Sequence, residues 1–275
     1  MTKQTETVDL YNGLHTIEYD DEAHTYRHLQ KGLYIDGCTS VLKVLDKSEF
    51  LVPWAAKMAA LAYSQAVKDW IAEEKDKPGA LTWRNYFASV SAFEQAAKDE
   101  WRIKRDSAGG VGTVAHDYAQ DKMLGQENLL ALADENPEVK KAVAAVDEFF
   151  DKHTFEVEHV ERIMFSPKHW VAGRSDWIGS IDGGPKAIND YKVSKRFFKD
   201  RPYLSYALQF GGYALMYEEE FGEPIDEANL IRLDRKSGKP YIHNIKLTKD
   251  IKDAFLFCRG LEQTISRIKK DGQVG

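Results

Sequence analysis

Residues 171–193 read VAGRSDWIGSIDGGPKAINDYKV. Two runs in which apolar and polar residues alternate flank the DGGP segment at 182–185, and a glycine- and proline-rich segment of this kind favours a tight turn between two strands. A third run, EVEHVERIMFS at 156–166, precedes them across the SPK turn signal at 166–168. The spacing therefore predicts three successive strands in an antiparallel meander.

Segments on both sides of this meander show the periodicity of helices. We expect a helix over Pro53–Glu74 and another over 82–105 that ends before the Gly109–Gly110 pair. Two strands, at 228–234 and 241–247, should separate helices at 203–220 and 249–270. A small hairpin at 16–36 and further helices from Thr113 and over 137–152 complete the pattern. The fold class is thus α/β, with a mixed central sheet flanked by helices and a mainly helical N-terminal region. We expect a single domain over 1–275, with 1–110 mostly helical and 111–275 carrying the core.

Composition restricts the class of protein. The chain has 275 residues, 43% of them hydrophobic, which is enough for a sizeable core. No apolar run approaches the roughly 20 residues needed to span a bilayer, and the polar start MTKQTETVDLYNG lacks a signal-peptide pattern. Cys38 and Cys258 are too few and too far apart for a disulfide framework or a four-cysteine metal site. We expect a protein of a reducing cytoplasm with no membrane partner.

The formal net charge of −6 is not that of an overall nucleic-acid binder. Any contact with phosphates must come from a local basic patch, because clustered Lys and Arg are needed to displace counterions. The sequence offers two candidate runs, which could equally be solvated surface: one comprises Lys192, Lys195, Arg196, Lys199 and Arg201, and the other Arg102, Lys104 and Arg105.

Asp190-Tyr191-Lys192 lies on a predicted strand, one hairpin after Asp176. Residues two apart on a strand share a face, so Asp190 and Lys192 point the same way and Tyr191 points the other way. If the hairpin pairs in the register that its turn suggests, Asp176 lies alongside. Two carboxylates held close together favour a divalent cation such as Mg²⁺ or Mn²⁺, and a nearby lysine can stabilise charge on a phosphate. A lone D-x-K is common on surface strands, but this combination suits metal-assisted phosphodiester hydrolysis.

Two further segments supply side chains to such a site. GTVAH at 112–116 predicts a helix capped by Thr113, with His116 in its first turn. An imidazole ligand there would shift the preference towards manganese. Gln209 and Tyr213 are four apart on the helix that follows the D-x-K strand, so they share one face and could hold the lysine or a phosphate.

These motifs, in this order, resemble the RecB-like exonuclease branch of the PD-(D/E)XK nuclease superfamily. The matching pieces are GTVAH at 112–116, AGRSDWIG at 172–179, INDYKVSK at 188–195 and QFGGY at 209–213. CTSVL at 38–42 is similar to an element near the start of such proteins. The resemblance implies a restriction-endonuclease-like core, and it assigns roles to seven residues: His116, Asp176 and Asp190 as metal ligands, Lys192 as the family lysine, Gln209 with Tyr213 as the Q-x-x-x-Y pair, and Glu161 as the glutamate of the preceding strand, with Glu158 as the nearby alternative.

The resemblance also implies a function. A member of this branch would be a metal-dependent deoxyribonuclease using one or two Mg²⁺ or Mn²⁺ ions, acting on single- or double-stranded DNA ends in recombination, repair or degradation. Lys195, Arg196, Lys199 and Arg201 would contact DNA. The cysteines that some relatives use for an iron-sulfur cluster are missing, so none is expected, and a helicase loop is absent from the sequence. A bacterial or phage-infected cell, with a homo-oligomer or a recombination-protein partner, fits this reading.

Other interpretations of the same residues stay open. A nuclease fold without activity could serve as a DNA- or protein-binding module, although decay usually removes the acids first. A hydrolase of small phosphoesters would use the same metal chemistry. The run GVGTVA at 110–115 fits a dinucleotide-binding turn loosely, but it follows a charged helical segment and not a strand. Gly173-Arg174-Ser175-Asp176 lacks the second glycine of a nucleophile elbow. Cys38 is better explained by packing than as a thiol nucleophile.

Overall fold

The computed structural model describes residues 5–45, 48–128, 131–132, 134–195 and 202–271, and at the helical positions 48–51, 54, 101, 102, 104 and 105 it describes the backbone alone. By its internal contacts the chain divides into two compact units. Residues 1–45 together with 114–275 form the first, which we call the sheet unit, and residues 46–113 form the second, the helical unit.

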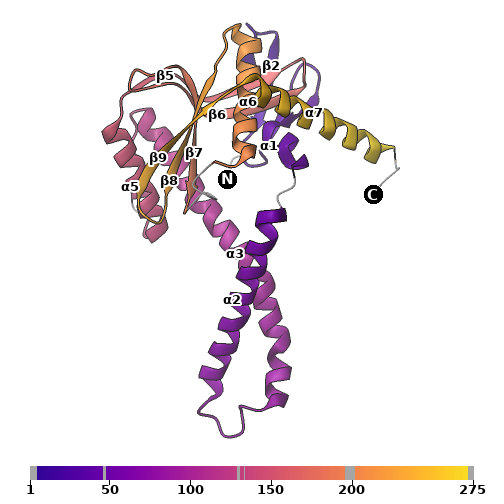
Figure 1. The fold of residues 1–275 in the computed structure, drawn as a ribbon, viewed down its shortest axis with the longest axis vertical. Helices are drawn as coiled ribbons and strands as arrows, with labels where there is room; N and C mark the ends of the chain where they lie inside the picture. Colours follow the sequence, from indigo (N-terminus) through magenta and orange to yellow (C-terminus); the bar gives the residue numbers. More distant parts are fainter. Residues whose placement is uncertain (1–4, 46–47, 129–130, 133, 196–201, 272–275) are drawn as a thin grey trace. The chain divides into compact units, whose positions relative to one another are not determined.

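A mixed sheet organises the sheet unit (Figure 1). Its strands lie in the order β1-β2-β3-β4-β6-β7-β8-β9, and β5 pairs with β6 outside this path. The predicted meander is present: β5 (Phe155–Ser166), β6 (Val171–Ile181) and β7 (Ala187–Ser194) pair antiparallel in sequence order. The β4–β6 and β7–β8 pairs are parallel, which makes the sheet mixed. The α/β class is therefore confirmed.

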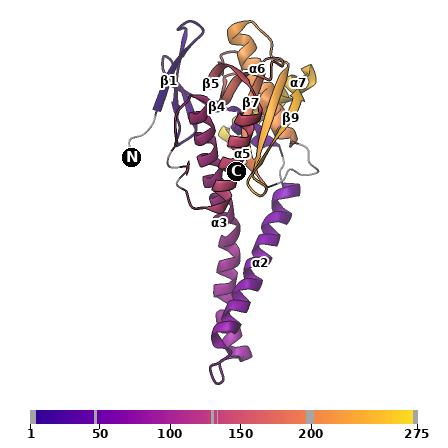
Figure 2. The same cartoon turned by 90° about the vertical axis from the view of Figure 1, so that its left-hand side faces the viewer.

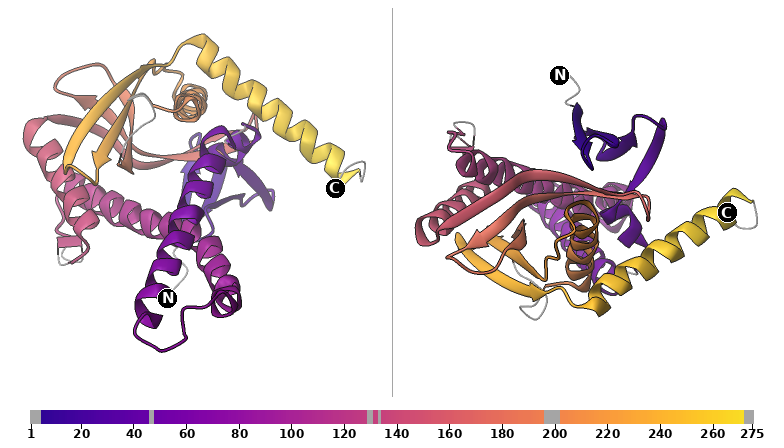
Figure 3. Two further views of the ribbon diagram at one scale, coloured as in Figure 1. Left: turned by 60° about the horizontal axis from the view of Figure 1, so that its bottom comes forward. Right: turned by 90° about the horizontal axis from the view of Figure 1, so that it is seen from above.

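Helices cover both faces of this sheet (Figure 3). On one face, α6 (Leu204–Phe221) and α7 (Lys249–Lys270) enclose a core with residues of β5, β7 and β8. On the other face, α5 (Pro137–Lys152) packs Phe149 against Tyr191 of β7, with the ring centroids 6.0 Å apart. Asn136 caps α5 by accepting a hydrogen bond from the backbone N–H of Glu138 at 2.9 Å. Strands β8 (Glu227–Asp234) and β9 (Lys239–Lys246) complete this part of the sheet as predicted.

The N-terminal segment holds more strand than the one expected hairpin. It forms β1 (Thr5–Leu10), β2 (His15–Asp20), β3 (Thr25–His28) and β4 (Leu33–Gly37). Buried Ile17, Tyr19 and Tyr26 share a small core with Ile163 and Phe165 of β5. The helical character expected of the N-terminal region begins only with the short helices α1 (Cys38–Val41) and η1 (Leu42–Val44).

The helical unit consists of α2 (Ser48–Glu74) and the first part of α3 (Trp83–Met123), which run antiparallel side by side (Figures 1 and 2). Aromatic rings join them: Tyr63 and Phe93 lie edge to face with centroids 5.8 Å apart. The helix expected to start at Pro53 begins at Ser48 and includes the proline. Proline removes one backbone hydrogen bond, and the other turns of this long helix keep theirs.

Helix α3 corrects a second expectation. It continues through Gly109, Gly110 and Gly112 without a break, whereas the sequence predicted one helix ending before this segment and another opening near Thr113. Glycine in a helix interior costs about 1 kcal/mol per residue, which a helix held elsewhere tolerates. Thr113 is therefore not a cap: its hydroxyl donates back to the carbonyl of Gly109 at 3.3 Å. Consequently His116 lies deep inside a long helix and not in a first turn.

Two other predictions concern the environment of the chain. Both cysteines are free and buried in the same core cluster, as a packing role for Cys38 requires. Of the helices that the described residues form, none has the length and apolar character that crossing a bilayer demands.

Candidate active site

Strand pairing brings Asp176 and Asp190 opposite each other. The β6–β7 ladder runs from Gly179↔Ala187 to Trp177↔Asn189, so Asp176 and Asp190 are the next facing positions in the same register. The carboxylate of Asp176 accepts a hydrogen bond at 2.6 Å from the backbone N–H of Tyr191. This bond fixes the carboxylate across the gap between the two strands. The register that the sequence suggested for this hairpin is the observed one.

Burial and mutual charge perturb this pair. Asp190 is only 4% exposed, and burial together with the charge of Asp176 raises the pKa of Asp190 to about 6. Burial also raises the pKa of Asp176, but His116 and Lys192 outweigh it and hold that pKa below its ordinary value. Lys192 forms an ion pair with Asp190. Burial lowers the pKa of Lys192, yet the two aspartates raise it overall, so the ammonium stays charged.

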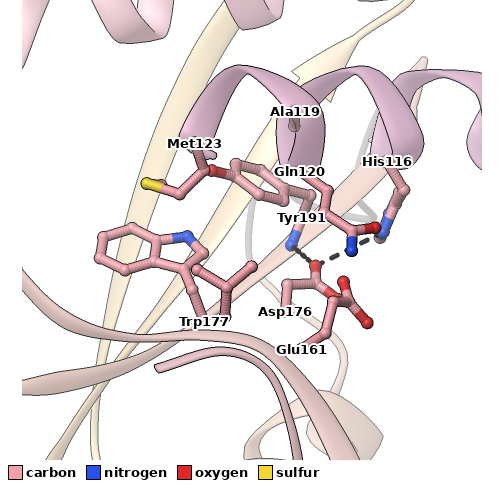
Figure 4. Close-up of a pocket in the computed structure, with 9 residues that line it drawn as sticks. His116, Ala119, Gln120, Met123, Glu161, Asp176, Trp177 and Tyr191 are labelled. Atoms are coloured by element: carbon pink, nitrogen blue, oxygen red, sulfur yellow. Dashed lines mark hydrogen bonds and ion pairs between the residues drawn. The ribbon is translucent and has the colours of Figure 1, made fainter. Parts of the chain in front are cut away.

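Helix α3 contributes His116 to the same place (Figure 4). Its Nδ1 lies 3.4 Å from Oδ2 of Asp176, and its ring meets that of Tyr191 edge to face. Burial lowers the pKa of His116, but the nearby Asp176 carboxylate raises it above its ordinary value. The imidazole is therefore held beside the acids although its position in the helix differs from the predicted one.

Strand β5 adds Glu161. The register on either side of it, Val160↔Trp177 and Arg162↔Ser175, places Glu161 opposite Asp176. Its backbone has a φ of +50°, a left-handed conformation that a residue other than glycine rarely adopts and that often marks a functional site. Burial, followed by the charge of Asp176, raises the pKa of Glu161 to about 7. We call Glu161, Asp176 and Asp190 the acid cluster.

The neighbouring glutamate, Glu158, serves a different group of residues. It accepts a hydrogen bond from the hydroxyl of Tyr217 at 2.8 Å and pairs with Lys186 at 2.7 Å. The structure therefore favours Glu161 over Glu158 as the glutamate beside the aspartates.

Arg174 is a member of the site that the sequence reasoning missed. Its Nε lies 2.8 Å from Glu161, and its guanidinium also bonds Asp21 and lies over the ring of Tyr19. The available signal was its spacing: Arg174 stands two residues before Asp176, and such residues share a strand face. Its charge compensates Glu161 in this conformation.

Gln209 and Tyr213 meet each other on α6. The amide of Gln209 donates to the Tyr213 hydroxyl at 2.6 Å. The Tyr213 ring packs so closely on Gly173 that a Cβ there would lie 2.4 Å from the ring. Among the contacts of the described residues, none joins Gln209 or Tyr213 to Lys192. On the same helix, the ring centroid of Tyr206 lies 5.9 Å from the Lys192 ammonium.

The predicted DNA-contacting run is only partly visible. Lys195 is exposed just after the end of β7 and pairs with Glu138 of α5 at 2.6 Å. Arg196, Lys199 and Arg201 lie outside the described residues. The second basic run lies in α3, where the structure gives only the backbone of Arg102, Lys104 and Arg105.

The acid cluster and His116 offer the donors that a divalent cation would need. Within the described ranges, no three or more His, Cys, Asp or Glu side chains converge as a formed metal site. Lys192 and Arg174 take up the contacts of Asp190 and Glu161 instead. The chemistry of the donors still fits: burial is the main cause of the raised pKa values of Asp190 and Glu161, so their negative charge is costly there, and carboxylates with one imidazole suit magnesium or manganese. Binding an ion between them requires both cationic side chains to give up part of these contacts.

Comparisons with known proteins add little. No protein-family model matches the chain, and no curated protein does. One solved structure, of a Eubacterium rectale protein named as a candidate exonuclease, aligns over 60% of this chain and 69% of its own at 19% identity, with a TM-score of 0.40. A second, of a protein known by a locus designation, aligns over 55% and 84% at 15% identity, with a TM-score of 0.28. At these scores neither alignment carries an argument, so the function must be argued from the site.

Proposed function

We propose that this chain is a divalent-metal-dependent deoxyribonuclease that hydrolyses phosphodiester bonds, acting from DNA ends as an exonuclease. The observation that supports it most is the meeting of Asp176 and Asp190 where the β6–β7 ladder ends, with Lys192 paired to Asp190. Burying two carboxylates side by side is costly unless positive charge compensates them. A site built at this cost suits a reaction that uses a cation and an anionic substrate.

The acid cluster and His116 would hold one or two Mg²⁺ or Mn²⁺ ions, with Asp176 and Asp190 as the principal ligands. A bound divalent ion lowers the pKa of water and neutralises charge on a phosphate.

Lys192 would stabilise the substrate phosphate as charge develops on it. Its ammonium stays protonated because the two aspartates raise its pKa. A preorganised cation in a partly buried site acts more strongly than the same cation in water. The resemblance to RecB-like nucleases assigns the same role to this lysine.

Gln209 and Tyr213 would act as positioning residues. Their mutual hydrogen bond and the packing of Tyr213 on Gly173 couple α6 to the strand that carries Asp176. Their effect on the phosphate or on Lys192 would therefore pass through the geometry of β6.

The biological setting follows from the same resemblance. We expect a role in DNA recombination, repair or degradation in the cytoplasm of a bacterial or phage-infected cell, with a homo-oligomer or a recombination protein as a possible route to processivity. Lys195, Arg196, Lys199 and Arg201 would contact the DNA strand.

The deciding experiment incubates the pure protein with end-labelled linear single- and double-stranded DNA and with a closed circle, in manganese, magnesium or EDTA. Asp190→Asn removes one acid of the pair and should abolish cleavage. Asp226→Asn is the matched control, because Asp226 is 73% exposed and pairs only at the surface with Lys252. Metal-dependent loss of linear DNA with the circle intact is the expected result. No cleavage of any substrate by folded protein in either metal would favour the inactive binding module.

A further inference from the structure

A second group of charged residues lies where β7 and β8 end. The strands pair in parallel up to Ser194↔Asp234, and the backbone N–H of Arg235 donates to the carbonyl of Ser194 at 3.3 Å. Lys195 and Arg235 therefore leave the sheet side by side. Helix α5 begins opposite them with Pro137 and Glu138.

These elements enclose a surface pocket with an excess of positive charge. We call it the basic pocket; its lining is Pro137, Glu138, Lys141, Lys195, Arg235 and Lys236. Four of these six residues are cationic and one is acidic, in a chain whose net charge is −6. Such a local reversal of charge is what a bound anion requires.

Glu138 occupies the pocket as an internal anion. Its two carboxylate oxygens contact Lys195 at 2.6 Å and Arg235 at 3.0 Å. Lys141 lies close by, with its ammonium donating to the carbonyl of Lys236 at 2.8 Å. The Nε of Arg235 is buried and makes no hydrogen bond to the described residues, so among them one donor of the pocket has no partner.

The position of the pocket relative to Lys192 suggests its ligand. Lys195 lies just past the end of β7 and three residues after Lys192, which is a rise of roughly 10 Å along the backbone at about 3.3 Å per residue. Side chains alternate between the two faces of a strand, so Lys195 lies on the α5 side with Glu138, whereas Lys192 lies on the α6 side with Asp190 and Tyr206. A DNA strand advances about 3.4 Å of helix axis per nucleotide, so a strand that passes around the end of β7 needs at least about three nucleotides between the two groups. A small phosphoester bound at the acid cluster cannot span this separation, but a polynucleotide can.

We propose that the basic pocket binds an internal backbone phosphate of the DNA strand at least about three nucleotides from the bond that is cleaved. The inference deepens the proposed function, on which it rests for the identity of the substrate. The phosphate replaces the Glu138 carboxylate on Lys195 and Arg235. Glu138 thereby acts as a competitor that keeps the pocket closed to weak anions.

Binding in EDTA tests this without any cleavage. The affinity of a fluorescently labelled oligonucleotide is measured by anisotropy over a range of salt concentrations, with the full chain and three variants. Losing one phosphate contact should lower the slope of log Kd against log salt by about 0.7–0.9, which at 0.1 M salt is about a five- to eightfold loss of affinity. We expect this loss for Lys195→Gln, whose side chain is 54% exposed and does not support the fold.

Glu138→Gln gives a result that a structural role cannot imitate. Removing the carboxylate should tighten binding, because Lys195 and Arg235 no longer have a competing anion within the protein. The substitution leaves the start of α5 intact, since the backbone N–H of residue 138 keeps its hydrogen bond to Asn136. Lys140→Gln is the matched control: Lys140 lies on the same helix, pairs with Glu135 and is not part of the pocket lining, so its affinity and slope should equal those of the parent.

Each outcome decides the proposal. An unchanged slope for Lys195→Gln, or weaker binding by Glu138→Gln, overturns it. A protein that binds DNA through this pocket but cleaves none refutes the proposed function and leaves the pocket assignment intact. Cleavage of DNA that is indifferent to Lys195→Gln and Glu138→Gln refutes the pocket alone.

Discussion

The acid cluster and the basic pocket both border β7 and both mix carboxylates with cations, yet the pKa values of Glu161 and Asp190 in the first are shifted in the opposite direction to that of Glu138 in the second. In the acid cluster, burial and neighbouring acids raise the pKa of Glu161 and Asp190. In the basic pocket, the hydrogen bond from Lys195 and the charge of Arg235 lower the pKa of Glu138 although burial opposes them. The first group gathers three carboxylates and suits a divalent cation, whereas the second has four cationic side chains around one carboxylate and suits an anion.

The largest expected effect separates Lys192 of β7 from Lys195, which lies just past the end of that strand. Lys192→Met should lower kcat/KM about 100- to 1000-fold on long DNA and on a dinucleotide alike, because it removes charge stabilisation at the reacting phosphate. Lys195→Gln should lower it only on long DNA, since a dinucleotide is too short to reach the basic pocket. Steady-state kinetics on both substrates measures this. If Lys195→Gln lowered kcat/KM equally on long DNA and on the dinucleotide, the basic pocket would not act separately from the acid cluster.

The free energy of unfolding of the metal-free protein, measured against pH, should show the opposite pKa shifts of Glu161 and Glu138. Glu161 has a raised pKa in the folded state, so its contribution to stability is present below pH 4.5 and lost as the pH rises through about 7. Glu161→Gln should remove this part of the pH dependence, about 2 kcal/mol between pH 5 and 8, or roughly 5 °C in Tm. Thermal melts in EDTA across this range provide the measurement.

Glu138→Gln is the contrasting variant in the same melts. The pKa of Glu138 is lowered in the fold, so its contribution is present above pH 4.5 and lost as the pH falls through its lowered pKa. The carboxylate is partly exposed, and surface ion pairs contribute little, so the change should be under about 1 kcal/mol and confined to acidic pH. If Glu161→Gln and Glu138→Gln changed the stability over the same pH range, the two carboxyl pKa values would not be shifted in opposite directions.

How much of this could be predicted from the sequence differs between strands and helices. The meander and the pairing of Asp176 with Asp190 follow from strand alternation and turn residues, which are local signals. The continuous path of α3 through three glycines could not be predicted in this way, because local propensity argued for a break, whereas the buried Val111, Ala115 and Ala119 hold the helix. His116 nevertheless lies beside Asp176, because its position depends on how α3 packs on the sheet and not on where the helix begins.

The residues that sequence reasoning missed share one property: they come from strands or loops far apart in the chain. Arg235 reaches Lys195 only through the parallel β7–β8 pairing, and Glu138 comes from a helix more than 50 residues earlier. Arg174 was in view within the AGRSDWIG motif, but its partners Glu161 and Asp21 lie on other elements. Spacing along one chain segment does not report such long-range contacts.

A smaller effect tests whether α6 belongs functionally to the acid cluster. Tyr213→Phe removes one hydroxyl, and with it the bond to Gln209, while keeping the ring that packs on Gly173. Supporting residues of this kind typically contribute about tenfold or more, so we expect roughly a tenfold loss of cleavage with little change in Tm. Tyr217→Phe, one turn along the helix with its hydroxyl on Glu158, is the control and should leave cleavage unchanged. Full activity of Tyr213→Phe would leave α6 as a packing element only.

The smallest effect concerns the imidazole, which distinguishes the acid cluster from a purely carboxylate site. His116 lies 3.4 Å from Asp176, and a nitrogen donor favours manganese over magnesium. Titration of metal-free protein should therefore raise Tm slightly more with manganese, by about 1–2 °C at equal concentration. In His116→Ala the two ions should become equivalent, while His153→Ala, which loses a surface contact with Asp182, should retain the difference. If His116→Ala keeps the manganese preference, the ion is held by carboxylates alone, and His116 serves to orient Asp176.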